Sequence, residues 1–415
     1  MRLLFLSNFY PPADRGGWEQ WCQEIADAFI ARGHAVRVLT SRYLAAQTPI
    51  QPHVQRLLHL ENDLEHYRPA DFFLSLAAHD RYNARTLAAA VREFSPHAIL
   101  IWGMWQLNPQ LAVLAEDLCP GRVGYYMCGY WPIEPDIHTQ FWQTPEKKTW
   151  VQTMKWLGAP LAHRILMNDR SRSPQFLHVA SVSRAVLDIF ASKGLDLPDA
   201  NVIYGGIKLN QFSAPISSLA MEGLESQARL VFAGSVSPEK GVQTAIQAVA
   251  LLAHRFNSDR LHLTIIGAGH PDFEKEMHDL VQKSAIKHYV SFMGRVPKDD
   301  MAQVLHKFNV LLFPSIWPEP LARMTMEAMA SGMALISTTT GGTREILTHG
   351  ENALTYSAGD GNDLSRQIVR LMEEPGLADR LGANALRTAH ERLDFGRMVD
   401  ELEAFAENIV EEKTP

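Results

Sequence analysis

The sequence alternates short apolar runs with helical patterns, and it does so twice. In the first half, an apolar run at residues 2–7 precedes a loop, a helical pattern at 18–31 and a second apolar run at 35–40. The alternation begins again at residues 230–234. Apolar runs that alternate with helices are typical of parallel β-sheets covered by helices. We therefore expect two α/β domains of the Rossmann-like class.

The length of the chain fits this division. A chain of 415 residues has enough material for two hydrophobic cores, and 46% hydrophobic and 20% charged residues are ordinary for a globular protein. A weakly patterned connector follows residues 201–212, where we place the boundary. We expect the first domain over residues 1–205 and the second over 206–390, followed by an amphipathic helix within 391–415.

Charge and cysteine content exclude several classes of protein. A net charge of −7 argues against a general nucleic-acid binder, which would have a basic face. The three cysteines have no metal-ligand spacing, and their odd number predicts reduced thiols in the cytoplasm. No run reaches the ~18 apolar residues that span a bilayer, and the first apolar run is too short for a signal peptide. We expect a cytoplasmic protein whose membrane contact is at most peripheral, on the inner face; its oligomeric state stays open.

Two glutamates, Glu319 and Glu327, lie eight residues apart where the pattern predicts a loop, a helix and a buried strand. Pro320 is expected at the helix start, where its missing N–H has no cost. Glu327 would then lie about 12 Å further along the axis than Glu319. Two carboxylates that cleave a glycosidic bond lie roughly 5–9.5 Å apart, so this pair is too widely spaced for that reaction.

The start of the same helix is a predicted phosphate-binding site. Its first N–H groups, between the two glutamates, have no partner inside the helix and lie at the positive end of its dipole. A diphosphate with hydroxyl groups on both sides has the shape of a nucleotide-sugar. The alternative is a solvated helix on which the two glutamates are unrelated.

Other candidate ligands follow predicted strands. Gly16 and Gly17 follow the first strand, where a phosphate or sugar could approach bare backbone; a tight turn without a ligand is the alternative. Lys240 lies between a strand and a helix and is expected to bind phosphate, with a solvated loop lysine as the alternative. Gly267 begins a Gly-x-Gly after the strand 261–266, a weak indication of a nucleotide.

These segments resemble the retaining glycosyltransferases of family 4, which have the two-domain GT-B fold. The resemblance covers nearly the whole chain and is strongest over residues 230–360. The family signature reads Glu-Pro-Phe-Gly, five residues, then Glu-Ala. The matching motifs in this chain are Glu319-Pro320-Leu321-Ala322 with Glu327-Ala328, Lys240-Gly241 after Ser235, and Arg32-Gly33-His34-Ala35-Val36.

The resemblance implies an activity. Such an enzyme transfers a sugar from a nucleotide-diphosphate-sugar, a UDP- or GDP-sugar, to a hydroxyl acceptor with retention of configuration. Polysaccharide or glycoconjugate biosynthesis is the expected setting, and no metal or other cofactor is required. The two domains would face each other across a cleft, and the helix within 391–415 would pack back on the first domain.

The resemblance also implies roles for individual residues. Glu319 would position the sugar, Lys240 would neutralise the diphosphate, and both count as catalytic. Glu327 would bind the ribose hydroxyls. The other expected donor ligands are Gly16, Gly17, Ser235, Gly267, Arg295, Val296, Arg323, Met324 and Thr325, and Cys128 and Gly129 are expected on the acceptor or sugar side.

Three positions depart from the family pattern. Ala322 replaces a glycine, Ser235 an arginine, and Cys128 a histidine that members often have. Two alternatives therefore stay open: a catalytically weakened sensor or scaffold that binds sugar nucleotides, and a nucleotide-sugar epimerase on the same fold.

One further segment is both aromatic and basic. Residues 147–157 lead into an apolar stripe that includes Leu157 and Leu161. We expect a helix that packs this stripe into the core; a membrane-facing helix is the alternative.

Overall fold

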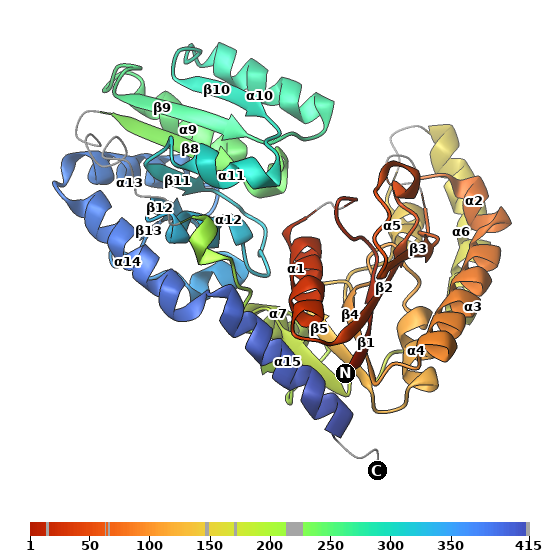
Figure 1. Cartoon of the computed structure of the whole chain (residues 1–415). Coiled ribbons are helices and arrows are strands. Elements are labelled where there is room, and N and C mark those ends of the chain that lie inside the picture. Colours follow the sequence, from red (N-terminus) through yellow and green to blue (C-terminus); the bar gives the residue numbers. More distant parts are fainter. Residues whose placement is uncertain are drawn as a thin grey trace. The chain divides into compact units, whose positions relative to one another are not determined.

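The computed structural model describes residues 1–13, 16–62, 64, 67–145, 149–169, 172–212 and 227–411. It divides into two compact units (Figure 1). Met1–Val182, Val186–Ile203 and Val399–Pro415 form the first unit, and Ser183–Ala185 with Tyr204–Met398 form the second. The predicted domain limits stay a prediction.

The first unit contains a seven-stranded parallel sheet in the order β3-β2-β1-β4-β5-β6-β7. Every residue of the central strand β4 is buried, as expected for a strand covered on both faces. The strands are β1 (Arg2–Ser7), β2 (Ala35–Ser41), β3 (Val54–Leu58), β4 (Ala98–Gly103), β5 (Val123–Met127), β6 (His178–Ser181) and β7 (Asn201–Val202).

Helices connect these strands, and α1 shows why they form. It buries Trp21, Cys22, Ile25 and Phe29, which recur at helical spacing on one face. The helices are α1 (Gly17–Ala31), α2 (Pro69–Leu74), α3 (Leu76–Phe94), α4 (Gln110–Leu118), α5 (Ile137–Gln143), α6 (Thr149–Asp169) and α7 (Arg184–Ser192).

The expected core packing of α6 is wrong for the part of its stripe that the structure describes. Leu157 and Leu161 are exposed, whereas Lys155 and Ala162 are buried. In the described part of the stripe, the helix therefore presents its leucines to solvent.

The second unit contains a six-stranded parallel sheet in the order β10-β9-β8-β11-β12-β13. Its strands are β8 (Ala228–Ala233), β9 (Leu261–Ile266), β10 (Val290–Gly294), β11 (Val310–Phe313), β12 (Ala334–Ser337) and β13 (Leu354–Thr355). Its helices are α9 (Val242–Leu252), α10 (Pro271–Lys283), α11 (Lys298–Leu305), α12 (Arg323–Ala330), α13 (Gly361–Glu373) and α14 (Leu377–Arg392).

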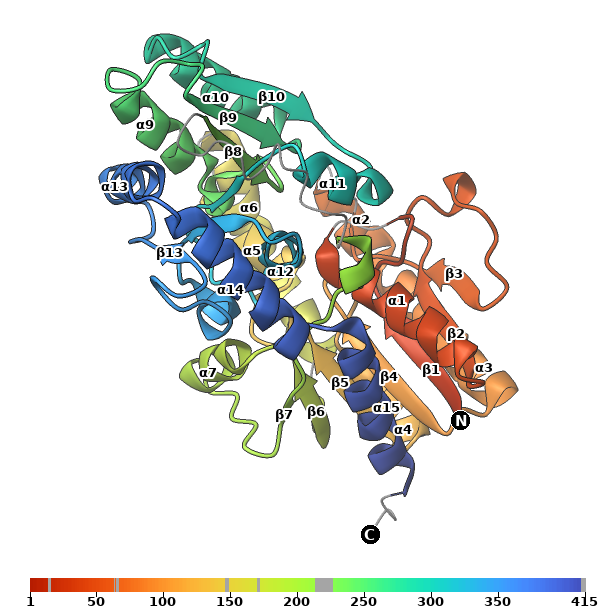
Figure 2. The same ribbon diagram turned by 60° about the vertical axis from the view of Figure 1, so that its left-hand side comes forward.

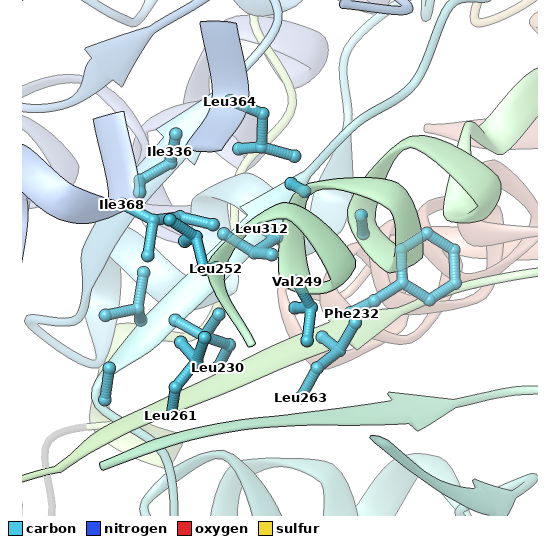
Figure 3. Packing of buried hydrophobic residues seen from close by; sticks show 14 of the residues in the cluster. Leu230, Phe232, Val249, Leu252, Leu261, Leu263, Leu312, Ile336, Leu364 and Ile368 are labelled. Carbon is cyan, nitrogen blue, oxygen red and sulfur yellow. The ribbon is translucent and has the colours of Figure 1, made fainter. Parts of the chain in front are cut away.

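An apolar cluster joins this sheet to several of its helices. Leu230 and Phe232 are two residues apart on β8, so both point to the same side of the sheet, in the cluster that contains Val249 of α9 (Figure 3). Ile336 of β12 lies near Ile368 of α13 in the same cluster. Figure 2 shows α9, α10 and α13 of this unit from a second direction. The core therefore holds β8 and its neighbours rigidly, so that the loops at their ends have a defined position.

The last helix, α15 (Phe395–Glu411), lies within the range 391–415 that the sequence predicts. Within the first unit, Arg32 and His34 donate hydrogen bonds to Glu403, and Arg32 also pairs with Asp400. The hydrogen bond from His34, followed by that from Arg32, lowers the pKa of Glu403. Throughout the described ranges, no helix combines the length and apolar character needed to cross a membrane.

These bonds predict a pH-dependent contribution to stability. The folded pKa of Glu403 lies below its unfolded value of about 4.3, so its carboxylate stabilises the fold above that pH and ceases to do so as pH falls through the folded pKa. We expect Glu403→Gln to lower the free energy of unfolding at pH 7 by about 1 kcal/mol. Denaturant titrations at a series of pH values should show this gap closing under acidic conditions.

The exposed Glu407 on the same helix supplies the control. Glu407→Gln should change stability little at any of these pH values. A deficit of Glu403→Gln that stays constant with pH would contradict the assignment.

Candidate functional site

The predicted donor ligands follow the two strands at which the strand order of the second sheet reverses. β8 leads to β9 and β10 on one side, whereas the neighbouring strand β11 leads to β12 and β13 on the other. Parallel sheets bind ligands outside the carboxyl ends of their strands at such a switch point. Lys240 follows β8 and Glu319 follows β11, so both belong to this point.

Lys240 and Glu319 form an ion pair. Lys240 Nζ donates to Glu319 Oε1, and Ser315 Oγ donates to the same oxygen at 2.9 Å. The side chain of Glu319 is 11% exposed and that of Lys240 is 31% exposed. A nearly buried carboxylate needs such partners, since an unpaired one would be costly. The lysine keeps the solvent access that an anionic ligand would use.

Backbone contacts hold the loops after β8 and β11 together. The carbonyl of Glu239 accepts hydrogen bonds from the N–H groups of Ile316 at 2.9 Å and Trp317 at 3.2 Å. Gly241 has φ +69°, and a Cβ there would lie 1.9 Å from the Pro314 carbonyl oxygen. Glycine is therefore required next to Lys240, both for the left-handed backbone and for the close approach.

The expected helix start at Pro320 is wrong, because α12 begins at Arg323. The carbonyl of Glu319 accepts the N–H of Gly342 at 2.7 Å, and the carbonyl of Pro320 accepts the hydroxyl of Ser183 at 2.5 Å. These two carbonyls are engaged outside the helix. Residues 319–322 therefore form a loop that leads into α12.

The start of α12 lacks a capping side chain. Ala322 is the N-cap residue and makes no side-chain hydrogen bond to the helix, while Thr325 Oγ1 donates to the Ala322 carbonyl at 2.7 Å. An N-terminus without a side-chain cap fits the predicted phosphate seat at Arg323, Met324 and Thr325. That role stays a prediction.

Glu327 lies one turn into α12 and is buried. Arg323 Nε donates to its Oε1 at 3.0 Å, and both side chains are at most 10% exposed. The guanidinium fixes the direction of the carboxylate, since a charge-assisted bond between nearly buried groups is geometrically strict.

The remaining predicted donor ligands follow three adjacent strands. Ser235 follows β8, Gly267 follows β9, and Arg295 and Val296 follow β10. Gly267 has φ +132°, and a Cβ there would lie 1.8 Å from the Gly234 carbonyl oxygen. Packing between neighbouring loops is thus sufficient to require this glycine, and its presence is no evidence for a nucleotide.

In the first unit, the predicted ligands follow β1 and β5. Gly16 is the N-cap residue of α1 and Gly17 is its first residue. They follow β1, which lies beside β4 where the strand order of the first sheet reverses. Cys128 follows β5 and is buried, and burial raises the pKa of its thiol well above the usual value. A neutral thiol results. Gly129 has open space where a Cβ would be.

The sequence analysis missed Ser315, which binds Glu319 directly. It also missed Ser183, whose hydroxyl holds the Pro320 carbonyl. The position of Ser315, two residues after the buried strand β11, was an available signal because such positions lie at the ligand-binding edge of a parallel sheet. Ser183, just before α7, was interpretable as a helix N-cap, but its bond to Pro320 was not predictable because the two residues are 137 positions apart.

A second feature of this unit is a cavity of about 820 Å³. Its lining contains one carboxylate, Asp360, and no basic side chain, which is a poor environment for a diphosphate. The switch point, which has Lys240, is therefore the better candidate for a diphosphate. The residues that line the cavity are Gln247, Ala250, Leu251, Ser284, Ala358, Gly359, Asp360, Gly361 and Asn362.

Within the described ranges, no group of three or more His, Cys, Asp or Glu side chains is arranged to hold a metal ion.

A family model described as "Glycosyl transferases group 1" matches residues 221–388, which contain the whole candidate site of the second unit. The chain belongs to this family. It is a retaining glycosyltransferase of family 4 that uses a nucleotide-sugar donor, as the sequence predicts.

Relatives of this glycosyltransferase match it along most of its length. It is 22% identical to an uncharacterized glycosyltransferase of Methanocaldococcus jannaschii, over 97% of this chain and 96% of the relative. It is 26% identical to a glycogen synthase of Mycobacterium tuberculosis, over 95% of this chain and 90% of that enzyme.

Solved structures confirm the predicted GT-B fold. The Anabaena protein Alr3699/HepE in complex with UDP-glucose superimposes with a TM-score of 0.70 and 20% identity, over 98% of this chain and 100% of that one. A sucrose-phosphate synthase of Thermosynechococcus elongatus gives a TM-score of 0.72 and 16% identity, over 99% of each chain.

The close approach at Gly241 predicts an unusually costly alanine substitution. Both Gly241→Ala and Gly376→Ala place a Cβ on a left-handed backbone, which costs roughly 1–2 kcal/mol. Only Gly241 also meets a neighbouring carbonyl, since nothing lies within 4 Å of a Cβ at Gly376. Urea denaturation should show a loss of stability that is larger by at least about 1 kcal/mol for Gly241→Ala. Equal losses would mean that the contact with Pro314 is unimportant.

Proposed function

We propose that this glycosyltransferase takes a UDP-sugar as its donor and binds it at the β8/β11 switch point of the second unit. The single observation that carries this proposal is the ion pair of Lys240 and Glu319 beside the uncapped start of α12. The uridine base is supported by the UDP-glucose that the Anabaena structure contains. All three cysteines are free, which supports a cytoplasmic location.

Lys240 acts on the leaving group. Transfer breaks the bond between the anomeric carbon of the sugar and a phosphate oxygen, and the bonding electrons stay on the diphosphate. The ammonium of Lys240 and the N–H groups of Arg323–Thr325 stabilise this growing negative charge. Ser235 lines the same edge and can donate a hydrogen bond where other members supply an arginine.

Glu319 positions the sugar. Its Oε1 accepts the bonds from Lys240 and Ser315, so the carboxylate is held in one orientation. Its Oε2 is then the atom that accepts hydrogen bonds from sugar hydroxyls. The acceptor hydroxyl attacks the anomeric carbon from the side of the departing diphosphate, which retains the configuration, and its proton passes to the departing phosphate oxygen.

Glu327 binds the ribose of the donor. Its carboxylate is held by Arg323 at one oxygen and is suited to accept hydrogen bonds from the ribose hydroxyls. Arg295 and Val296, at the end of β10, contact the base. The donor therefore extends from the end of β10 to the end of β11.

The first test measures catalysis and donor binding together. The wild-type chain should release UDP from one member of a panel of UDP- and GDP-sugars when a hydroxyl acceptor is present. Lys240→Gln should weaken UDP binding, measured by calorimetry, by about ten- to a hundredfold, since hydrogen bonds to charged groups contribute roughly 1.5–3 kcal/mol.

Two variants control this test. Lys287→Gln removes an exposed lysine of the same unit and should bind UDP like the wild type. Lys240→Gln combined with Glu319→Gln avoids leaving a buried carboxylate unpaired and should still bind UDP weakly. Nucleotide binding without any release would favour the sensor, and an isomerised donor formed without an acceptor would favour the epimerase.

A second test isolates the ribose contact. Glu327→Gln should weaken the binding of UDP about tenfold, because a charge-assisted hydrogen bond to the ribose is replaced by a neutral one. The same variant should bind 2′,3′-dideoxy-UDP as the wild type does, since that ligand lacks both hydroxyls. Equal weakening for the two ligands would show that Glu327 acts only on the structure of α12.

A further inference from the structure

Three large apolar side chains in the described part of α6 face outward. Its inward face consists of Lys155, Gly158, Ala159 and Ala162, which recur at helical spacing; Lys155 is 3% exposed and Ala162 is fully buried. The outward residues are Trp156, Leu157 and Leu161, which are 74%, 64% and 56% exposed. A helix that meets only water on that side would normally have the opposite arrangement.

Specific contacts hold α6 in this orientation. Lys155 Nζ donates to the Thr144 carbonyl at 3.0 Å and lies 3.9 Å from the centre of the Phe141 ring. A Cβ at Gly158 would lie 3.0 Å from the ring of Trp142, so the small residue admits the indole of α5. Rotating the leucines inward would break the buried lysine contacts. The exposure of the leucines is therefore built into the packing.

The neighbouring helix α2 extends the exposed apolar surface. Its Phe72 packs against Ala162 of α6, which places the two helices in contact. The next two residues of α2, Phe73 and Leu74, are 41% and 82% exposed. We call Phe73, Leu74, Trp156, Leu157 and Leu161 the apolar face. Single exposed apolar residues are ordinary, but five large ones on two touching helices indicate an interaction surface.

The sequence around this face is strongly basic. Between residues 146 and 172 it contains two acidic residues, Glu146 and Asp169, and six basic ones, although the chain as a whole has a net charge of −7. Lys155 is turned inward and Arg172 pairs with Asp117. The other basic residues in this interval are Lys147, Lys148, Arg164 and Arg170. Such a segment would repel a second copy of itself and attract an anionic surface.

We propose that the apolar face docks this protein on an anionic phospholipid bilayer. Tryptophan prefers the boundary between headgroups and acyl chains, and leucines beside it enter the outer part of the hydrocarbon. The basic segment adds attraction to the headgroups. This docking is independent of the proposed donor site, which lies in the other unit.

Vesicle sedimentation of the intact chain tests the proposal. The protein should sediment with vesicles of phosphatidylcholine and phosphatidylglycerol, bind less as salt is raised, and bind weakly to phosphatidylcholine alone. Leu157→Ser and Leu161→Ser should each lower the partition coefficient about tenfold, because each removes most of a buried leucine's transfer free energy.

Leu177→Ser is the matched control, since Leu177 is 59% exposed in the same unit but lies outside the apolar face. It should sediment like the wild type, and all three variants should keep the wild-type melting temperature, because no core contact is removed. Equal binding of Leu157→Ser, Leu161→Ser and wild type would overturn the proposal. So would a concentration-dependent dimer that Leu157→Ser abolishes, because a second copy would then cover the face.

Discussion

The candidate site depends on the backbone contact between the loops that leave β8 and β11. The Glu239 carbonyl accepts the N–H groups of Ile316 and Trp317, and Gly241 lets the first loop reach Pro314. Through this junction, Lys240 meets Glu319 although the two residues are 79 positions apart in the chain. The core under β8 fixes one side and β11 fixes the other. The ion pair is thus a consequence of sheet topology as much as of its own charges.

The fold was predictable because strands buried on both faces are apolar throughout. The runs at 2–7 and 261–266 correspond to β1 and β9 residue for residue, and the tail helix lies within the range that its pattern predicts. Two predictions failed for nonlocal reasons. Pro320 lies outside α12 because Gly342 and Ser183 donate hydrogen bonds to the carbonyls of Glu319 and Pro320, respectively. The stripe on α6 was visible, but periodicity does not say which face of a helix is inside.

The candidate site was predictable to the extent that strand ends mark it. Lys240 was identified by its position between a strand and a helix and Glu319 by its spacing from Glu327, and the structure brings the two together. Ser315 was missed although it follows β11, because a serine after a proline reads equally well as a turn. Gly267 was noted for a nucleotide, whereas its neighbour Gly234 is sufficient to require it. Because Ser235 and Ala322 replace the arginine and glycine of the family pattern, the proposed phosphate site consists of Lys240 and backbone N–H groups.

The central claim is that a nucleotide diphosphate binds at the β8/β11 junction and not at the cavity of about 820 Å³ beside α13. Hydrogen exchange of the intact chain with and without UDP, followed by mass spectrometry, tests it most directly. The account predicts slower exchange in peptides that cover residues 235–241 and 316–325, with no change over 357–362. Protection confined to 357–362, or unchanged exchange at the junction when UDP is bound, would contradict it.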